Sequence, residues 1–377
     1  MSQQENQAKD YNWPKDEFTQ REMTSFWGLI IGVGLVIVLT LVLSLVSFSM
    51  GSGFVIAYCA QDQVYAEPIF QDFEKETGIK VRAVYDNEAV KTVGLANRLL
   101  AERNHPQCDV FWGNEEMRTR QLAAQNIFGI PGADKAVRAP DGWAAFGHRS
   151  RRIVINTNHL SLASAPHSLL ELTNTAWRGK VALAYPQFGT TATHFHALRQ
   201  LWGDQSWQTW CRALAANKPF LVDGNSVVVK LVGRGEAWIG LTDSDDIAEG
   251  QHNGLPIIPL PITSETLLIP NTVALVRNAP HPDSARRLFD YLQQPKIVQG
   301  LVSVGALEDL SGQTGEAFGV RSRSIGSALA ESSEAKQKRQ RTGALQDAAA
   351  PTLTPDWPAL LRDLDSTTTK LNEIFLR

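Results

Sequence analysis

Cysteine is scarce in this chain, and its spacing excludes the common cysteine chemistries. The three cysteines, Cys59, Cys108 and Cys211, form no CxxC pair and no spacing that is typical of a zinc site. Cys108 begins the apolar run CDVFW. The sequence therefore disfavours a structural zinc or a dithiol redox centre, and it predicts that all three thiols are small buried hydrophobes.

An excess of charge and the short motifs of common enzymes are also absent. Charged residues make up 20% of 377 residues, with a formal net charge of -3, so nothing points to nucleic acid. No GxSxG, Walker loop or HExxH motif occurs. His194 and His196 stand two apart on a predicted helix and so face different sides, which disfavours a shared metal. An enzyme using Glu115 and Asp243 as acid and base has no supporting feature, so we expect a protein that is not an enzyme.

One long apolar run near the N-terminus is the strongest local signal. Phe26 to Met50 is 25 residues without a charge. At about 1.5 Å per residue such a helix crosses a hydrocarbon core of about 30 Å. Lys and Arg precede the run and do not return until Lys75, which places the N-terminus in the cytoplasm. We predict a cytoplasmic tail (1–24) and a single-pass inner-membrane anchor (25–50), with cleavage near Ser49 as the alternative.

Strand-like and helix-like segments alternate after the apolar run. FVIAYCA predicts a strand, Val64 to Thr77 predicts a helix that ends at Gly78, and IKVRAVY predicts a second strand. A helical pattern over 88–103 and the apolar strand CDVFW follow. This alternation is typical of parallel strands joined by crossover helices, so we expect an α/β fold.

Two long extended segments divide the pattern into two lobes. RRIVINTN (151–158) and TLLIPNTVALVRN (266–278) have the β content of crossing strands, and a second α/β series lies between them. We expect a hinged pair of lobes, with lobe one at 51–150, lobe two at 151–275 and a return to lobe one at 276–310.

The C-terminal part combines a polar segment with a helix. Residues 311–350 are rich in Ser, Gly, Ala and Gln and include the basic run KQKRQR, which predicts a flexible insertion. Residues 351–377 return to a helical apolar pattern, with Pro358 near its start. We expect this helix to pack on lobe one.

Polar residues follow most of the predicted strands, at the edge where open α/β sheets bind ligands. Asp, Asn, Ser and Thr also cap the helices that start there, so capping competes with binding at each position. Thr190 and Thr191 are best placed, because hydroxyls and backbone N–H groups at a helix start bind anions. We expect alanine at Thr191 or Asp243 to abolish ligand-induced stabilisation while lowering ligand-free stability only slightly. The candidate ligand-binding residues are Asp62, Glu88, Asn114, Glu115, Thr190, Thr191, Asn225, Thr242 and Asp243.

Four stretches in this order resemble a known family: VIAYCAQDQVYAEPIFQDFEKETGIKVRAVYD, DVFWGNEE, RGEAWIGLTDSDD and PNTVALVRNAPHPDSARRLFDYL. They are similar to the ferric-ion group of periplasmic solute-binding proteins that serve ABC transporters, over about 53–305 and 356–377. The resemblance implies a type 2 periplasmic-binding-protein fold that closes on a small ligand and presents it to a membrane permease. The binding domain would lie in the periplasm or outside the cell. We expect a monomer, because no amphipathic partner helix is evident.

The sequence departs from this family at the metal site. The resemblance implies two adjacent metal-binding tyrosines after the strand AWIGL, where this chain has Thr242 and Asp243. Asp62, Glu115 and Asp243 offer hard oxygen ligands for Fe(III), but no phenolate. Fe(III) as the transported ligand therefore stays open beside a phosphorylated or other small organic solute held by the two threonines and Asn225. A ligand-sensing ectodomain is a further alternative.

Overall fold

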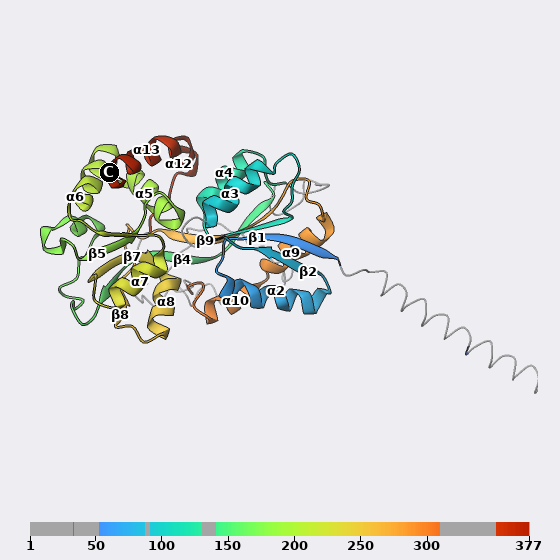
Figure 1. Ribbon diagram of the computed structural model, residues 1–377, viewed down its shortest axis with the longest axis horizontal. Coiled ribbons are helices and arrows are strands. Elements are labelled where there is room, and N and C mark those ends of the chain that lie inside the picture. The colour runs from blue at the N-terminus through green and yellow to red at the C-terminus, as the bar shows by residue number, and fades with distance from the viewer. Residues whose placement is uncertain (1–32, 34–52, 87–90, 130–140, 310–351, 377) are drawn as a thin grey trace, which may run out of the picture. The chain divides into compact units, whose positions relative to one another are not determined.

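The computed structural model describes residue 33 and residues 53–86, 91–129, 141–309 and 352–376 of the chain. Residues from Phe54 onward form one compact unit in which helices cover both faces of a sheet (Figure 1). The described strands follow the order β2-β1-β3-β9-β4-β7-β5-β6, with β8 paired to β4. The predicted α/β class is confirmed. The strands are β1 (Phe54–Cys59), β2 (Lys80–Val84), β3 (Val110–Gly113), β4 (Trp143–Asn156), β5 (Val181–Ala184), β6 (Phe220–Val222), β7 (Ile239–Asp243), β8 (Ile257–Pro259) and β9 (Leu268–Leu275).

The first lobe is built on the parallel strands β1, β2 and β3, with five helices around them. One face is covered by helices whose apolar residues, among them Phe70 and Phe73, share a single core with β1 and β3. The other face packs Leu95 and Leu99 against Tyr58 and Phe111. Truncating such a buried aromatic to alanine costs about 3–5 kcal/mol. The first set is α2 (Gln63–Thr77), α9 (Pro282–Leu292) and α10 (Pro295–Ser303); the second is α3 (Lys91–Ala101) and α4 (Glu116–Ala124).

The second lobe repeats this plan around β5, β6 and β7. One face holds a core that contains Phe195, Trp207 and Trp210, and the other packs Val228 and Val232 against β4 and β5. The helices of the first face are the 3-10 helices η1 (Leu169–Thr173) and η2 (Thr175–Trp177), with α5 (Gly189–Trp202) and α6 (Asp204–Ala216); those of the second are α7 (Asn225–Gly233) and α8 (Ser244–His252).

Two antiparallel strands connect the lobes. β9 pairs with β3 of the first lobe and with the first part of β4, and β4 then pairs with β7 of the second lobe from Arg151 onward. Both predicted crossings are confirmed, although β4 begins at Trp143, eight residues before the predicted segment at 151. The early start is explained by the partner, since Trp143 to Phe146 pair with β9.

The C-terminal helices pack on both lobes, whereas we predicted lobe one alone. α12 (Trp357–Arg362) contacts both α4 and α5, and α13 (Leu364–Phe375) packs on α5 and α6. Leu371 and Phe375 belong to the core of the second lobe, and the Phe375 ring meets the Phe195 ring edge-on with centroids 5.9 Å apart. The expectation that the last helix closes lobe one was therefore wrong, because its apolar stripe matches the face of α5 and α6.

Several local predictions can be compared directly with the structure. The helix stop at Gly78 is confirmed, since Gly78 has φ 73° and its N–H donates to Glu74 O. All three cysteines are buried, as expected, and none of them forms a disulfide with another. The predicted anchor (25–50), insertion (311–350) and Glu88 lie outside the described residues, apart from residue 33 in the anchor. Among the helices that the structure describes, none combines the length and the apolar character needed to cross a bilayer.

Candidate functional site

A buried hydrogen-bond network surrounds Arg151 where the strands of the second lobe end. Arg151 Nη1 donates to Asp243 Oδ1 at 2.7 Å and to Asn225 Oδ1 at 2.8 Å. Thr190 Oγ1 donates to Asp243 Oδ2 at 2.7 Å, and Asn225 Nδ2 donates to the same oxygen at 3.1 Å. Three of the residues predicted from the sequence, Thr190, Asn225 and Asp243, thus come together around one arginine.

Arg149 forms a second network that reaches the first lobe. Its Nη1 donates to Asp245 Oδ2 at 2.6 Å, and its Nη2 donates to the backbone oxygen of Asn114 at 2.6 Å. Arg149 Nη1 also lies 3.4 Å from Asp243 Oδ2. Because Asn114 follows β3 whereas Asp243 and Asp245 follow β7, this guanidinium joins the strand ends of both lobes.

Glu115 supplies another contact between the lobes. Its carboxylate accepts from the backbone N–H groups of Met117 and Arg118 at 2.6 and 2.9 Å, so it caps α4. It also accepts from Thr193 Oγ1 on α5 at 3.0 Å. Complete burial raises the pKa of Glu115. Glu115 therefore caps α4, as the capping interpretation has it, and the same carboxylate accepts a hydrogen bond from the second lobe.

The other candidate helix starts are not capped by side chains. Asp62 precedes α2 and Asp243 precedes α8, and neither carboxylate caps its helix. α5 and α7 begin after Phe188 and Gly224, again without a side-chain cap. Asp62 and Asp243 therefore contribute negative charge to the junction between the lobes, and their side chains do not cap the helices that follow them. Four helix N-termini at this junction carry the partial positive charge that favours anions.

Carboxylates accumulate on the α8 side of the junction. Asp243, Asp245 and Asp246 each offer an oxygen within 4.8 Å of the others. Burial raises the pKa of Asp245 to about 6, and the negative charges of Asp243 and Asp62 add to this despite the opposing Arg149. Asp245 Oδ1 is buried without a hydrogen-bond partner among the described residues. The site therefore holds more negative charge than its arginines neutralise.

Two predicted threonines lie apart from this network. The Thr242 hydroxyl donates to the backbone oxygen of Asn225 at 3.2 Å. Thr191 is buried on α5, and among the described residues its side chain has no hydrogen bond to the Arg151 network. Thr190, rather than Thr191, is thus the threonine that joins the network.

The expected behaviour of Asp243 needs correction. We predicted that its loss would hardly affect the ligand-free protein. Its side chain is 2% exposed and its oxygens contact two arginines. Removing one partner of a buried ion pair leaves an uncompensated charge and costs about 3–5 kcal/mol. Asp243 therefore stabilises the fold even without ligand.

The candidate residues predicted from the sequence include neither of two buried arginines and none of three buried side-chain amides. Arg149 and Arg151 stand in the polar run HRSRR inside the crossing strand β4, and both are buried, where charges need partners. Gln61, Gln187 and Asn271 are buried, and within the described residues neither amide atom of their side chains has a hydrogen-bond partner. Such groups are costly unless they bind something.

Register places two of these amides at one sheet edge. Cys59 is paired with Trp112, so Gln61 lies level with Asn114 beyond the end of β3. Thr272 is paired with Gly113, so Asn271 is the next residue toward the same edge. The buried amides therefore stand at the carboxyl ends of β1 and β3, where the arginine networks begin.

Comparison with known proteins places this geometry in context. A family model described as bacterial extracellular solute-binding protein matches residues 56–305. The Fe(3+)-binding periplasmic protein of Serratia marcescens is 29% identical over 196 residues, which is 50% of this chain and 56% of the relative. The chain thus spans little more than half the length of that relative.

Two solved structures share the fold at low identity. Iron-bound HitA from Pseudomonas aeruginosa has a TM-score of 0.67 at 17% identity, covering 85% of this chain and 99% of HitA. AfuA from Actinobacillus pleuropneumoniae, with fructose-6-phosphate bound, has a TM-score of 0.64 at 18% identity, covering 86% and 99%. These likenesses establish the two-lobed periplasmic-binding-protein fold.

Proposed function

This chain belongs to the family of bacterial extracellular solute-binding proteins, and we propose that it captures a small ligand between its two lobes for an ABC-type importer. The observation that carries the proposal is the buried polar junction. Arg149 reaches Asn114 O and Asp245, and Thr193 reaches Glu115, so groups from both lobes meet there. A hinged pair of lobes lined in this way has the parts of a ligand clamp.

We favour a hard cation of the iron(III) type as the ligand. Asp243, Asp245 and Asp246 present oxygens within 4.8 Å of one another, and carboxylate oxygens suit hard cations. The Asp62 charge adds to the negative potential at Asp245. The Serratia relative is named for Fe(3+) binding, which agrees with this chemistry. The departure from two tyrosines means that carboxylates would replace phenolates as ligands.

A phosphorylated organic solute is the second candidate, and a different feature supports it. α5 and α7 start at the junction without side-chain caps, and backbone N–H groups at helix starts bind phosphate. Thr190 and Asn225 stand at these two helix starts. AfuA, which shares the fold, holds fructose-6-phosphate. Here the arginines would exchange carboxylate partners for phosphate oxygens.

The predicted anchor fits this function. A span at 25–50 would hold the binding domain at the outer face of the inner membrane, close to a permease.

Thermal unfolding with and without ligand tests the proposal. Iron(III) citrate, with citrate alone as the blank, should stabilise the purified protein by RT ln(1 + [L]/Kd), about 2.7 kcal/mol at 100-fold excess over Kd. Asp246→Asn should reduce this gain, because Asp246 belongs to the acidic cluster and is only half-buried. Glucose-6-phosphate tests the second candidate in the same assay.

A matched variant controls for the loss of one charge. Glu236→Gln makes the same carboxylate-to-amide change at an exposed residue, before the opposite end of β7. It should keep the full gain. A gain with iron(III) citrate that is equal in both variants would remove the acidic cluster as the site, and no gain with either ligand would contradict both candidates.

A further inference from the structure

The second lobe contains a cavity whose lining shares Arg151 with the network of the proposed crevice. Its volume is about 380 Å³, within the range of about 300–1,000 Å³ that is usual for small-molecule sites. Ile153 of β4 and Leu241 of β7 line it, together with residues of the loops that precede η1 and β9. All lining residues fall between 151 and 266, so none comes from the helices of the first lobe.

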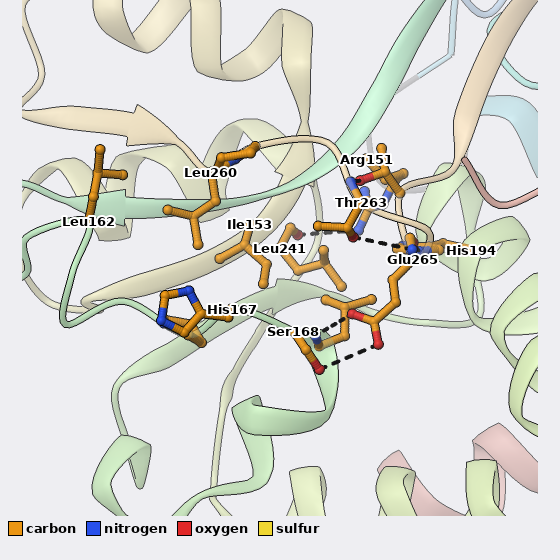
Figure 2. A pocket seen from close by; sticks show the side chains of 14 residues that line it. Arg151, Ile153, Leu162, His167, Ser168, His194, Leu241, Leu260, Thr263 and Glu265 are labelled. Atoms are coloured by element: carbon orange, nitrogen blue, oxygen red, sulfur yellow. Dashed lines mark hydrogen bonds between the residues drawn. The ribbon is translucent and has the colours of Figure 1, made fainter. Parts of the chain in front are cut away.

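Polar side chains gather at one end of this cavity. Figure 2 shows Arg151, His194 and Glu265 close together there. His194 Nε2 lies 2.7 Å from the Glu265 backbone oxygen, so Nε2 carries the proton and Nδ1 is left as an acceptor. Burial and the nearby Arg151 lower the pKa of His194 to about 3, which keeps the ring neutral.

Two buried polar atoms at this end have no partner. Arg151 Nε and His194 Nδ1 are buried, and within the described part of the chain neither makes a hydrogen bond. One is a donor and the other an acceptor. A buried polar atom without a partner costs about 1–3 kcal/mol, so a molecule that satisfies both atoms gains from binding there.

The opposite end is apolar. Leu162, Ile153 and Leu260 line it in Figure 2, away from Arg151, and the His167 ring lies on the same side. Leu162 is 56% exposed and stands where the cavity can be reached from solvent. An apolar body would replace water along these side chains.

The charges around the cavity favour a neutral ligand. Arg151 is already neutralised by Asp243 at 2.7 Å, and the Glu265 carboxylate accepts from Leu169 N at 2.6 Å. An anionic group on a ligand would lie beside the carboxylates of Asp243 and Glu265. A cationic group would lie beside the guanidinium of Arg151. A hydroxyl avoids both costs, because it can accept from Arg151 and donate to His194.

We propose that this cavity is a second binding site, for a small neutral alcohol with an apolar body. Its hydroxyl accepts from Arg151 Nε and donates to His194 Nδ1, and its body packs between Leu162, Ile153 and Leu260. The alcohol needs no group from the first lobe, and it uses Arg151 Nε, whereas the network of the proposed crevice uses Arg151 Nη1.

Methyl NMR of the full chain tests the site with benzyl alcohol as the probe. We expect saturable shifts of the Ile153, Leu241 and Leu260 methyl groups. Toluene, which lacks the hydroxyl, and benzoate, which is an anion, should each bind at least tenfold more weakly. Equal binding of toluene would overturn the alcohol class, and unsaturable shifts would overturn the site.

Two variants locate the binding within the cavity. Leu162→Trp should fill the apolar end and weaken benzyl alcohol at least tenfold, whereas Leu170→Trp, an exposed leucine on η1 that does not line the cavity, should not. His194→Phe should reduce benzyl alcohol to the affinity of toluene. If His194→Phe fails to fold, the two tryptophan variants still decide, because unchanged binding in Leu162→Trp contradicts the proposal. No crevice ligand is added, so this failure would leave the proposed function untouched.

Discussion

At the scale of single residues, the site depends on charges that are buried in pairs. Arg151 and Asp243 are both almost fully inaccessible to water, and Arg149 lies between Asp243 and Asp245. In such places the cost of desolvation is large, so each charge is retained only because its partner is present.

The Asp243–Arg151 pair gives the first prediction. Asp243→Asn should lower the free energy of unfolding by about 3–5 kcal/mol without ligand, because two arginines lose their carboxylate. Urea unfolding measures this. Asp204→Asn is the control: its partners Arg199 and Lys370 lie at a partly exposed surface, so the loss should be about 0–1 kcal/mol. Equal losses in the two variants would show that burial does not set the cost.

Histidine burial gives the second prediction. Burial, with Arg118 and Arg199 nearby, lowers the pKa of His196 to about 3. The unfolded chain then binds a proton between about pH 6.5 and pH 3 that the native protein does not, so the free energy of unfolding falls as pH falls through this window. His196→Phe should remove up to about 1.4 kcal/mol per pH unit of that slope. In urea unfolding from pH 8 to pH 5, the free energy of unfolding of the variant should rise relative to that of the parent protein. A difference between the two that does not change with pH would contradict the burial effect.

At the scale of elements, the junction is built by where strands end and helices begin. α5, α7 and α8 start beside β5, β6 and β7, and each start brings one short polar side chain, Thr190, Asn225 and Asp243, toward Arg151. Because parallel strands end on the same edge, these starts must be neighbours. β4 contributes differently, because it pairs first with β9 and then with β7. Arg149 and Arg151 therefore lie where this strand passes from one lobe to the other.

The last helix gives the third prediction. Phe375 is buried against Phe195 in the core of the second lobe, so Phe375→Ala should cost about 3–5 kcal/mol. Leu376→Ala, one residue later and 57% exposed, should change stability by less than about 0.5 kcal/mol. Urea unfolding of the two variants checks this, and small losses in both would mean that α13 does not hold the second lobe.

At the scale of the whole molecule, the chain from Phe54 onward forms one compact unit. Its cores draw on residues from Val55 to Phe375. The return of the chain through β9 places α9 and α10 on the first lobe and α13 on the second, so each lobe uses segments distant in sequence. The strands β4 and β9 join the two lobes, and the closure that we propose would bend them.

The anchor gives the fourth prediction. Full-length protein should stay in the membrane fraction after a high-salt wash, because a spanning helix is effectively irreversible compared with ionic adhesion. Residues 53–377 expressed alone should be soluble and monomeric by size-exclusion chromatography with light scattering. Release of a shorter form from full-length protein would instead indicate cleavage near Ser49.

The sequence alone determined the class of fold and the edge of the sheet that carries the site. Hydrophobic periodicity and turn residues such as Gly78 mark each element locally, so the alternation of strands and helices could be predicted. The position of polar residues after the strands followed from the same pattern, and it selected Thr190, Asn225 and Asp243.

Only the tertiary structure decided what those residues contact. Arg149 and Arg151 meet their partners across separations of 35 to 96 residues, and the pattern around each arginine gives no sign of such distant neighbours. For the same reason the sequence did not predict that Glu115 both caps α4 and holds α5, or that α13 packs on the second lobe. Periodicity reports which face of an element is apolar, whereas the identity of the surface opposite depends on how the whole chain packs.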